Sequence, residues 1–344
     1  MRAVVVREPG PDAVAELIDV EIPSPGRGAV RIKVVAATVN PVDLMVRGGV
    51  GGTPFAAERD QWGLGWDVAG TIDAVGPDVT DFTIGQPVIG ISDRLDVSLA
   101  AQAEYVVLET GNVAPAPTSV DLVAAATIPL NGLTALQALA ALDLKPGETL
   151  LITGAAGAVG GFAVELAAAQ GIRVIANAAP ADEAAVRALG AADFIPRTTG
   201  SCDAVGELVP GGGDAVYPAD EPLRSSGATA RTLDLADAVR ALIPGGVDAA
   251  LDAAALGPQP LAAVRSSGRF VSISVPNTPV PLRGTTVTTV LVHADRPQLD
   301  HLVSLVDAGK LTLRVADTYP LPDFATAHER LASGGLRGRL VLVP

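Results

Sequence analysis

Cysteine is almost absent from this chain of 344 residues, in which Cys202 is the only one. A single thiol excludes an intramolecular disulfide and a thiolate zinc cluster, because each needs several cysteines. Aromatic residues are also scarce, at 3%, whereas hydrophobic residues make up 49% of the chain and charged residues 18%. This balance favours a folded core of mainly aliphatic side chains. Cys202 lies in a Gly/Ser-rich segment, and we interpret it as incidental rather than catalytic.

Positive charge and long apolar runs are lacking as well. Lys and Arg number 24 against 38 Asp and Glu, the formal net charge is -14, and no Lys/Arg-rich run occurs. Phosphate binding by nucleic-acid-binding proteins depends on clustered cations, so we expect no nucleic-acid partner. No stretch reaches the roughly 18 apolar residues of a membrane helix, and the N-terminus MRAVVVREPG is too short and too charged for a signal peptide. We therefore expect a cytoplasmic protein with no membrane partner.

The first third of the chain is predicted to be rich in β-strands. Short apolar runs are separated by Gly/Pro turns such as PSPG at residues 23–26, and no long helical period appears. The expected strands cover residues 3–7, 29–38, 67–75, 86–91 and 104–108.

From residue 121 the pattern changes to an alternation of helices and strands. Such alternation builds a doubly wound parallel sheet with helices on both faces. The expected segments are residues 121–126, 134–142, 149–152, 173–176, 182–189, 193–195, 235–242, 247–252, 259–264 and 269–275. The tail is expected to rejoin the first domain, with strands at 286–292 and 339–343 and helices at 297–307 and 323–331. We place the β-rich domain at residues 1–122 and 290–344 and the parallel-sheet domain at residues 123–289.

An internal repeat lies in the second domain. Residues 197–219 recur without gaps at residues 231–253, and the two copies share the pattern DAVxxLxPGGxDA. The order of the shared residues is more than composition would produce, so we interpret the repeat as a tandem copy of one helix-strand unit. We expect residues 247–252, in the second copy, to form the strand of the sheet. Residues of about 198–230 would then be an insertion packed outside it.

The segment TGAAGAVGG at residues 153–161 follows an apolar run and precedes a helical pattern at residues 162–170. Strand, glycine turn and helix in this order are typical of a dinucleotide-binding site, because small residues let the backbone approach a pyrophosphate at the helix N-terminus. The three fingerprint positions are occupied by Ala155, Gly157 and Gly160, and Ala158 and Val159 are further expected cofactor contacts. An ordinary small-residue contact between helix and strand is the alternative interpretation.

The next strand ends at Asn177, where a site that prefers NAD usually has an Asp or Glu for the ribose 2′-hydroxyl. The missing carboxylate favours NADP, in its reduced form NADPH. Either Arg197 or its repeat equivalent Arg231 is a candidate partner for the 2′-phosphate, and a solvated surface arginine is the alternative for both.

The chain resembles the medium-chain dehydrogenase/reductase superfamily, in particular its zinc-independent quinone oxidoreductase (zeta-crystallin-like) branch. The matching motifs span nearly the whole chain: NPVD at 40–43, GWDVAGTIDAVG at 65–76, AEYVVL at 103–108, TIPLNGLTALQAL at 127–139, GAAGAVGG at 154–161, GRFVSI at 268–273 and RGRLVL at 337–342. The resemblance implies an α/β protein with a GroES-like β-rich catalytic domain and a Rossmann domain. It also implies a homodimer, for which we expect residues 269–275 to be the apolar edge strand.

Zinc-dependent relatives carry a cysteine and a Gly-His-Glu motif, but here Thr38 and Trp66 stand at the ligand positions. The three histidines, His293, His301 and His328, are too few and too far from cysteine to form another site. We therefore predict no catalytic metal. We also expect His301 and His328 to lie on helix surfaces.

By resemblance, Asn40 lies near the nicotinamide and donates a hydrogen bond to the substrate oxygen, although Asn before Pro41 is also a common turn residue. Asp43 is expected to orient Asn40 or support the cleft, more as a structural carboxylate than as a general acid. Thr134 is the preferred contact to the nicotinamide, with Thr127 and Asn131 beside it; the last two could instead cap helices. Ser272 and Arg337, in the GRFVSI and RGRLVL motifs, complete the expected cofactor residues.

The segment at residues 47–66 departs from the family. An aromatic residue usually follows NPVD, but Leu44 and Met45 stand there, and Trp62 and Trp66 come only after a glycine-rich loop. Met45 and the two tryptophans are candidate substrate contacts, since a tryptophan can stack on a flat ring. Packing of the tryptophans under the loop is the other interpretation.

Without a metal, we expect direct hydride transfer from NADPH to a quinone or an α,β-unsaturated carbonyl, with the protein fixing geometry and polarity. The departing loop and the insertion also suit an enoyl or ketone reductase dedicated to one biosynthetic intermediate. A nonenzymatic NADPH-binding protein is the third hypothesis.

Overall fold

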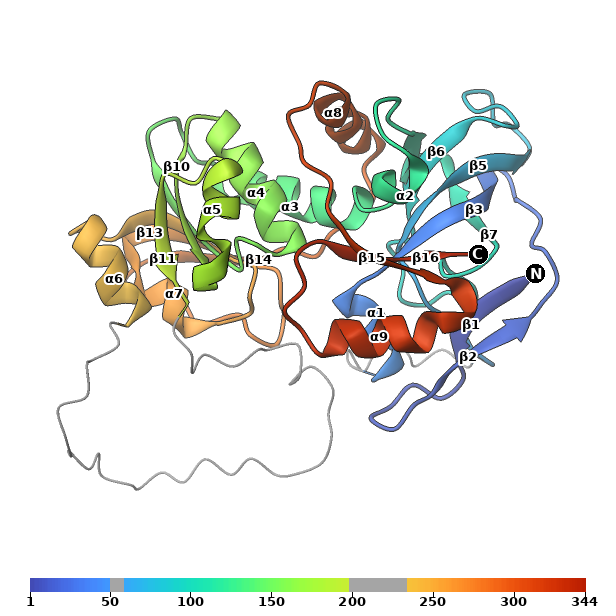
Figure 1. The fold of residues 1–344 in the computed structure, drawn as a ribbon, viewed down its shortest axis with the longest axis horizontal. Coiled ribbons are helices and arrows are strands. Elements are labelled where there is room, and N and C mark those ends of the chain that lie inside the picture. Colours follow the sequence, from blue (N-terminus) through green and yellow to red (C-terminus); the bar gives the residue numbers. More distant parts are fainter. Residues whose placement is uncertain (50–58, 198–233) are drawn as a thin grey trace.

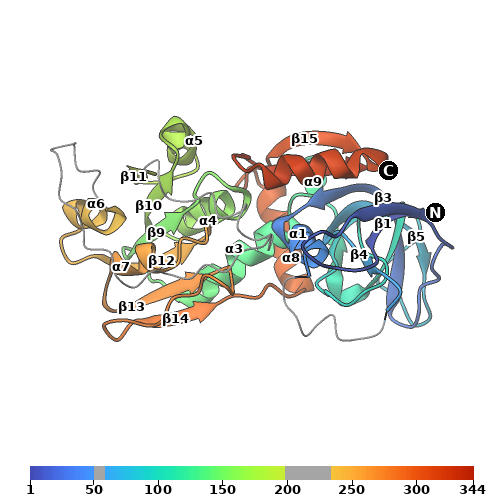
Figure 2. The same cartoon turned by 90° about the horizontal axis from the view of Figure 1, so that it is seen from below.

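The structure is a computed structural model that describes residues 1–49, 59–197 and 234–344. Figure 1 shows two parts, which we name the parallel-sheet domain and the antiparallel-sheet domain. The C-terminal strands and α9 lie beside the N-terminal strands, so the chain leaves the antiparallel-sheet domain once and returns to it (Figure 1). Figure 2 shows α3 and α8 where the two domains meet.

The parallel-sheet domain contains six strands in the order β11-β10-β9-β12-β13-β14, and every neighbouring pair is parallel. The chain runs from β9 outward to β11 and then returns to β12 on the other side of β9. This reversal is the point at which open α/β sheets bind ligands, at the carboxyl ends of the strands. The strands are β9 (Thr149–Thr153), β10 (Arg173–Ala178), β11 (Asp193–Pro196), β12 (Val247–Asp252), β13 (Val264–Ser272) and β14 (Thr286–Thr289).

Helices cover both faces of this sheet because side chains alternate between the faces along each strand. Leu150 and Ile152 of β9 belong to a core cluster that includes residues of α3 and α4, whereas Leu151 packs with residues of α6 and α7. The helices are α3 (Pro129–Leu142), α4 (Ala158–Ala169), α5 (Glu183–Ala188), α6 (Leu235–Leu242) and α7 (Pro258–Ala262). The predicted doubly wound sheet is confirmed, and residues 247–252 form β12 inside it. The proposed insertion at residues 198–230 lies outside the described residues.

The predicted edge strand is wrong. Residues 269–272 belong to β13, which has β12 on one side and β14 on the other, so β14 is the edge of the sheet. The strand expected at residues 286–292 is shorter, and β14 (Thr286–Thr289) lies within the predicted boundary of residues 123–289 rather than rejoining the first domain with the tail. Its residues pair in parallel register with β13, from Arg269 with Thr286 to Ser272 with Thr289, which fixes it to the parallel-sheet domain.

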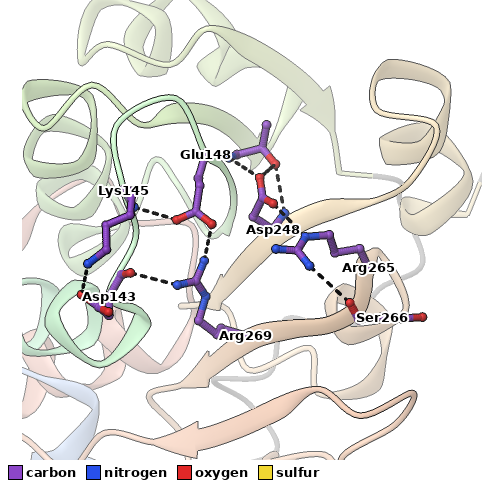
Figure 3. A network of polar contacts seen from close by, with 8 residues as sticks. Asp143, Lys145, Glu148, Asp248, Arg265, Ser266 and Arg269 are labelled. Carbon is purple, nitrogen blue, oxygen red and sulfur yellow. Dashed lines mark hydrogen bonds and ion pairs between the residues drawn. The ribbon is translucent and has the colours of Figure 1, made fainter.

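Ion pairs tie together the opposite, amino-terminal ends of the central strands (Figure 3). Asp248 of β12 accepts hydrogen bonds from the backbone and hydroxyl of Thr149 in β9 and pairs with Arg265 of β13 at 2.8 Å. Arg269 of β13 pairs with Glu148, just before β9, at 2.6 Å. These contacts fix the three strands to one another at the end of the sheet away from the glycine turn.

The antiparallel-sheet domain contains a seven-stranded sheet, with order β15-β16-β3-β5-β6-β8 and β7 also paired to β3, and a three-stranded sheet, β2-β1-β4. Its strands are β1 (Arg2–Val6), β2 (Ala15–Asp19), β3 (Ala29–Val39), β4 (Trp62–Gly63), β5 (Asp67–Val75), β6 (Pro87–Ile91), β7 (Tyr105–Glu109), β8 (Val113–Pro115), β15 (Val315–Pro320) and β16 (Arg339–Val343). Helices α1 (Pro41–Arg47), α2 (Leu122–Ala125), α8 (Arg296–Asp307) and α9 (Phe324–Ala332) complete it. Strand β15 escaped prediction because it is mostly exposed and lacks an apolar alternation.

Candidate functional site

The glycine turn joins β9 to α4 and depends on two close backbone approaches. Gly154 has a φ of +60°, which residues with side chains rarely adopt. A Cβ at Gly160 would lie 2.1 Å from the carbonyl oxygen of Gly154, so only glycine lets the helix pack this closely. Gly157 is the N-cap residue, with Ala158 and Val159 in the first turn of α4. The unpaired N–H groups of a first helical turn form a cradle that suits a phosphate.

Two candidate cofactor residues, Asn177 of β10 and Ser272 of β13, lie at the carboxyl ends of strands of the parallel sheet. The Ala155 N–H donates to the carbonyl of Asn177 at 3.1 Å, which fixes the glycine turn to the end of β10. The Asn177 amide is buried and donates to the carbonyl of Ile195. Ser272 ends β13, and its hydroxyl donates to the carbonyl of Ser274. Both side chains therefore support the backbone at the edge where the cofactor is expected.

The arginines proposed for the cofactor are scattered. Arg197 directly follows β11, and its N–H donates to the carbonyl of Ala178 at 2.7 Å, which places it beside the end of β10. Arg231 lies outside the described residues. Arg337 forms an ion pair with Asp182, just before α5, and its side chain is half exposed. That pair links the antiparallel-sheet domain to the segment that follows β10.

A small cavity, open to solvent, lies where the first turn of α4 meets the C-terminal part of the antiparallel-sheet domain. Two guanidinium groups, from Arg314 and Arg339, contribute to its lining. Neither was predicted from the sequence, although Arg339 lies on the same strand motif as Arg337, two residues further on. The lining residues are Thr127, Ala158, Phe162, Arg314, Gly338 and Arg339.

Asp67, at the start of β5, is the centre of a buried polar cluster beside this cavity. Its carboxylate accepts hydrogen bonds from the Thr38 hydroxyl, from the Asn40 side chain at 2.7 Å and from the Leu130 N–H at 2.5 Å. Leu130 is in the first turn of α3, so the positive end of that helix faces the carboxylate. Burial raises the pKa of Asp67, and these three donors oppose that shift. The sequence contained this residue in the GWD motif, but it was not predicted as part of the site.

The side chain of Asn40 is held at both ends. Its amide nitrogen donates to Thr38 Oγ1 at 2.8 Å and to Asp67 Oδ2 at 2.7 Å. Its oxygen accepts from Asn131 Nδ2 at 3.5 Å, and Asn131 Oδ1 in turn accepts from Arg339 Nη2 at 2.6 Å. Both amide hydrogens of Asn40 are therefore engaged, and donation to a substrate oxygen requires that one of these bonds be given up. That role of Asn40 stays a prediction.

Asp43 has the geometry of a structural carboxylate. It accepts from the backbone of Asn40 at 2.8 Å, in a capping box at the start of α1, and from the backbone of Gly65 at 2.9 Å. The Gln102 side chain donates to it at 3.1 Å. Burial raises the pKa of Asp43 to about 7, with the two backbone donors opposing the shift. This environment favours the structural role over that of a general acid.

The expectation that His328 lies on a helix surface is wrong, because its side chain is fully buried on the inner face of α9. Its Nε2 lies 3.0 Å from Gln102 Oε1. Since Gln102 Nε2 donates to Asp43, its oxygen accepts, and Nε2 of His328 carries the proton. Burial lowers the pKa of His328 to about 3, so the ring is neutral. His301 is exposed on α8, as expected.

The threonines of the predicted nicotinamide segment face different partners. Thr134 is buried on α3, and its hydroxyl donates to the carbonyl of Leu130 at 2.6 Å. Thr127 lines the cavity, and its hydroxyl donates to the carbonyl of Ala124 in α2. Asn131 does not cap a helix through its side-chain oxygen, because Arg339 occupies it. Only Thr127 of the three lines the cavity.

Both tryptophans belong to the core. Trp62 is 7% exposed and packs in a cluster with residues of β1, α1 and α9. Trp66 is 8% exposed and lies in the core cluster that reaches α3. This burial favours packing over stacking on a substrate ring. Met45 is half-buried on α1, and residues 50–58, which follow that helix, lie outside the described residues.

Within the described ranges, no group of three or more His, Cys, Asp or Glu side chains has the arrangement of a metal site. The hydroxyl of Thr38, at a zinc-ligand position of the relatives, donates to Asp67. No helix in the described part of the chain is both long enough and apolar enough to cross a membrane.

Two family models match the chain. The alcohol dehydrogenase GroES-like domain matches residues 26–118, and the zinc-binding dehydrogenase model matches residues 217–342. Among curated relatives, a 2-haloacrylate reductase from Burkholderia sp is 30% identical over 360 residues, which cover 100% of this chain and 99% of the relative. A trans-enoyl reductase from Aspergillus japonicus is 38% identical over 172 residues, or 46% of this chain. The chain spans only about half the length of that relative, 49%.

Solved structures resemble the whole chain. A quinone oxidoreductase from Coxiella burnetii has a TM-score of 0.78 at 28% identity, covering 100% of this chain and 99% of that one. A mycobacterial protein complexed with NADPH has a TM-score of 0.76 at 26% identity, covering 100% of both chains. These likenesses confirm the GroES-like and Rossmann architecture. The chain therefore belongs to the medium-chain dehydrogenase/reductase superfamily, in its quinone oxidoreductase branch.

Proposed function

We propose that this protein is a zinc-independent, NADPH-dependent reductase that transfers hydride to a quinone or an α,β-unsaturated carbonyl compound. The observation that carries the proposal is the glycine turn at the start of α4, where Ala158 lines the cavity together with Arg314 and Arg339. Arg339 in turn bonds to Asn131, which donates to Asn40 of the buried polar cluster. The N–H groups of the first turn of α4, which begins after the N-cap residue Gly157, fit the diphosphate of a nicotinamide nucleotide. Thr38 and Trp66, at the positions of zinc ligands in relatives, support chemistry without the metal.

When bound, the nicotinamide supplies the hydride. The chain's own contribution is orientation. Asn40 is held in one rotamer by a chain of hydrogen bonds that runs from Arg339 through Asn131 and Asn40 to Asp67. The carboxylate of Asp43 also accepts a hydrogen bond from the backbone N–H of Asn40. For Asn40 to stabilise negative charge on a substrate oxygen, its amide exchanges one of its two bonds, to Thr38 or to Asp67, for a bond to that oxygen. In the described residues around Asn40 no proton donor stands out, so we assign the proton to solvent.

NADPH preference rests on the end of β10. Asn177 stands where a carboxylate would repel a 2′-phosphate, and Arg197 is held beside it through its backbone bond to Ala178. We expect Arg197→Ala to raise the Kd for NADPH about 10-fold and to leave the Kd for NADH nearly unchanged, since one charge-assisted hydrogen bond is lost. Fluorescence titration with both nucleotides measures this. Arg231→Ala is the matched variant: if it alone weakens NADPH binding, the arginine of the second repeat copy holds the phosphate instead.

A second candidate is an enoyl or ketone reductase dedicated to one biosynthetic intermediate. The match to a trans-enoyl reductase favours it. Turnover of NADPH with a panel of small quinones and with enoyl thioesters separates the two functions. Tight NADPH binding with no turnover on either panel would instead support a nonenzymatic nucleotide-binding protein.

We propose a homodimer formed through the edge strand β14. Near this edge the segment that links β13 to β14 exposes Val275, Val280 at 78% and Leu282 at 50%, and Leu291 is exposed just after it. An unpaired edge with apolar neighbours is favoured to pair with a second copy. We expect Val280→Asp/Leu282→Asp to convert a dimer to a monomer in light scattering after gel filtration. Ile84→Asp, on another exposed apolar residue, is the control. A wild-type monomer at micromolar concentration contradicts this proposal.

A further inference from the structure

Arg314, between α8 and β15, crosses from the antiparallel-sheet domain to the glycine turn. Its Nη1 donates to the carbonyl of Ala156 at 3.0 Å, and its Nη2 donates to the carbonyls of Gly157 at 2.9 Å and Ala158 at 3.5 Å. The guanidinium is therefore hydrogen-bonded to the backbone at the start of α4. A guanidinium has five N–H donors, so these three bonds leave donors of Arg314, which lines the cavity, for a further acceptor.

Gly161 is shaped to receive this guanidinium. A Cβ at Gly161 would lie 1.7 Å from Arg314 Nη2 and 2.4 Å from its Cζ, far inside van der Waals contact. Glycine in the interior of a helix is destabilising relative to alanine, so its presence here needs a reason. The second glycine of the GG pair is therefore explained by the close approach of Arg314 rather than by the turn, which Gly160 already serves.

The charge of Arg314 is not neutralised by an ion pair within the described part of the chain. Its nearest acidic influence is Glu165, whose carboxylate oxygens accept instead from the Thr312 N–H at 3.1 Å. Burial lowers the pKa of Arg314, and the Glu165 charge opposes that shift. A half-buried cation beside the positive end of α4 is unfavourable unless an anion joins them. Arg339, the other cation of the cavity, is already bonded to Asn131.

We propose that Arg314 binds the diphosphate of the nicotinamide nucleotide, from the side of the cavity opposite the N–H groups of the glycine turn. The inference rests on the proposed nucleotide site. Arg314 then has two roles that one side chain combines: it carries a positive charge to the diphosphate, and it links the two domains across the bound nucleotide. Both roles depend on Gly161, because the absence of a Cβ there lets the guanidinium lie against α4.

The test compares a ligand that contains the diphosphate, NADPH, with one that lacks it, adenosine 2′-monophosphate. We expect Arg314→Ala to raise the Kd for NADPH about 10-fold and to change the Kd for adenosine 2′-monophosphate less than about 2-fold, as the loss of one charge-assisted contact predicts. Arg314→Lys keeps the positive charge but loses the planar set of guanidinium donors. Its Kd for NADPH is expected to lie between those of wild type and Arg314→Ala. Titration calorimetry gives all these constants without any turnover.

Gly161→Ala provides an independent arm. Its methyl group displaces the guanidinium, so it is expected to weaken NADPH binding as Arg314→Ala does, and the double variant is expected to bind no more weakly than either single variant. Arg296→Ala is the control, since Arg296 is a half-buried arginine paired with Asp81 in the antiparallel-sheet domain. Thermal unfolding of each variant confirms that it is folded.

Equal weakening of both ligands by Arg314→Ala, or unchanged NADPH binding, overturns the role of Arg314. So does a fully additive double variant, because it shows that the two residues act separately. If wild type binds NADPH but reduces no acceptor, the proposed reductase activity fails while the binding experiment still decides the role of Arg314. If wild type binds no NADPH, both proposals fail together.

Discussion

Asp252→Ala is expected to lower the free energy of unfolding of the parallel-sheet domain by about 4 kcal/mol or more, because several buried donors lose their acceptor at once. Asp252 ends β12 and is fully buried. Its carboxylate accepts from the Thr153 hydroxyl at 2.6 Å and from the N–H groups of Leu256 at 3.1 Å and Gly257 at 2.8 Å. It thus fixes the loop after β12 against the end of β9, directly behind the glycine turn.

Urea unfolding followed by circular dichroism measures this effect, and NADPH titration measures its consequence for the site. Asp237→Ala is the matched control, since Asp237 is an exposed residue of α6 in a 3.7 Å pair with Arg240. We expect it to change stability by less than about 1 kcal/mol. Comparable losses in the two variants would show that the loop after β12 does not depend on the Asp252 carboxylate.

Asp67→Asn is expected to destabilise the antiparallel-sheet domain by about 3 to 5 kcal/mol and to abolish most of the reductase activity. The substituted amide presents a donor where Thr38, Asn40 and Leu130 already donate. Arg339 also loses the nearby negative charge that raises its pKa against the effect of burial. Asn40 is then released from its rotamer, so kcat falls more than KM rises.

The measurement is thermal unfolding together with steady-state kinetics on the best acceptor found. Asp73→Asn is the matched control, because Asp73 lies on the same strand, β5, and pairs with Arg31 at 2.5 Å on the partly exposed face. We expect this control to cost less than about 1 kcal/mol and to leave kcat unchanged. A folded Asp67→Asn variant with wild-type kcat would contradict the orienting role of the polar cluster.

The repeat shows where sequence reasoning succeeded and why. The two copies compete for one strand position, and residues 247–252 of the second copy form β12. Asp252 corresponds, 34 positions earlier, to Pro218. Proline has no N–H for a ladder inside a sheet and no carboxylate to hold the following loop. Of the two copies, only the second therefore has a sequence that suits a central strand ending in this loop. This agrees with the prediction, made from the neighbouring segments, that residues 247–252 form the strand.

The surroundings of His328 and Arg314 could not be predicted from the sequence. His328 appeared to be a helix-surface residue because its own helix, α9, is rich in charged and small residues. It is buried on the inner face of α9, and its hydrogen-bond partner Gln102 lies 226 positions away, in the segment before β7. In the same way Arg314 has no local motif, and its importance follows from Gly161 on a helix of the other domain. Neither partnership is visible until distant segments are brought together.

Local patterns were sufficient for the glycine turn, the alternation of strands and helices, and the family. Each depends on residues close together in the chain: the φ of Gly154, the tight approach at Gly160 and the alternating apolar residues of β9 all follow from local backbone geometry. The identity of the edge strand, the choice of Arg314 and Arg339 over Arg337 at the cavity, and the double engagement of Asn40 required the folded chain. These features arise from pairing and desolvation between segments far apart in sequence, and no local period or spacing records them. The glycine turn could be read from the sequence, whereas the two arginines that line the cavity beside it, Arg314 and Arg339, come from the other domain.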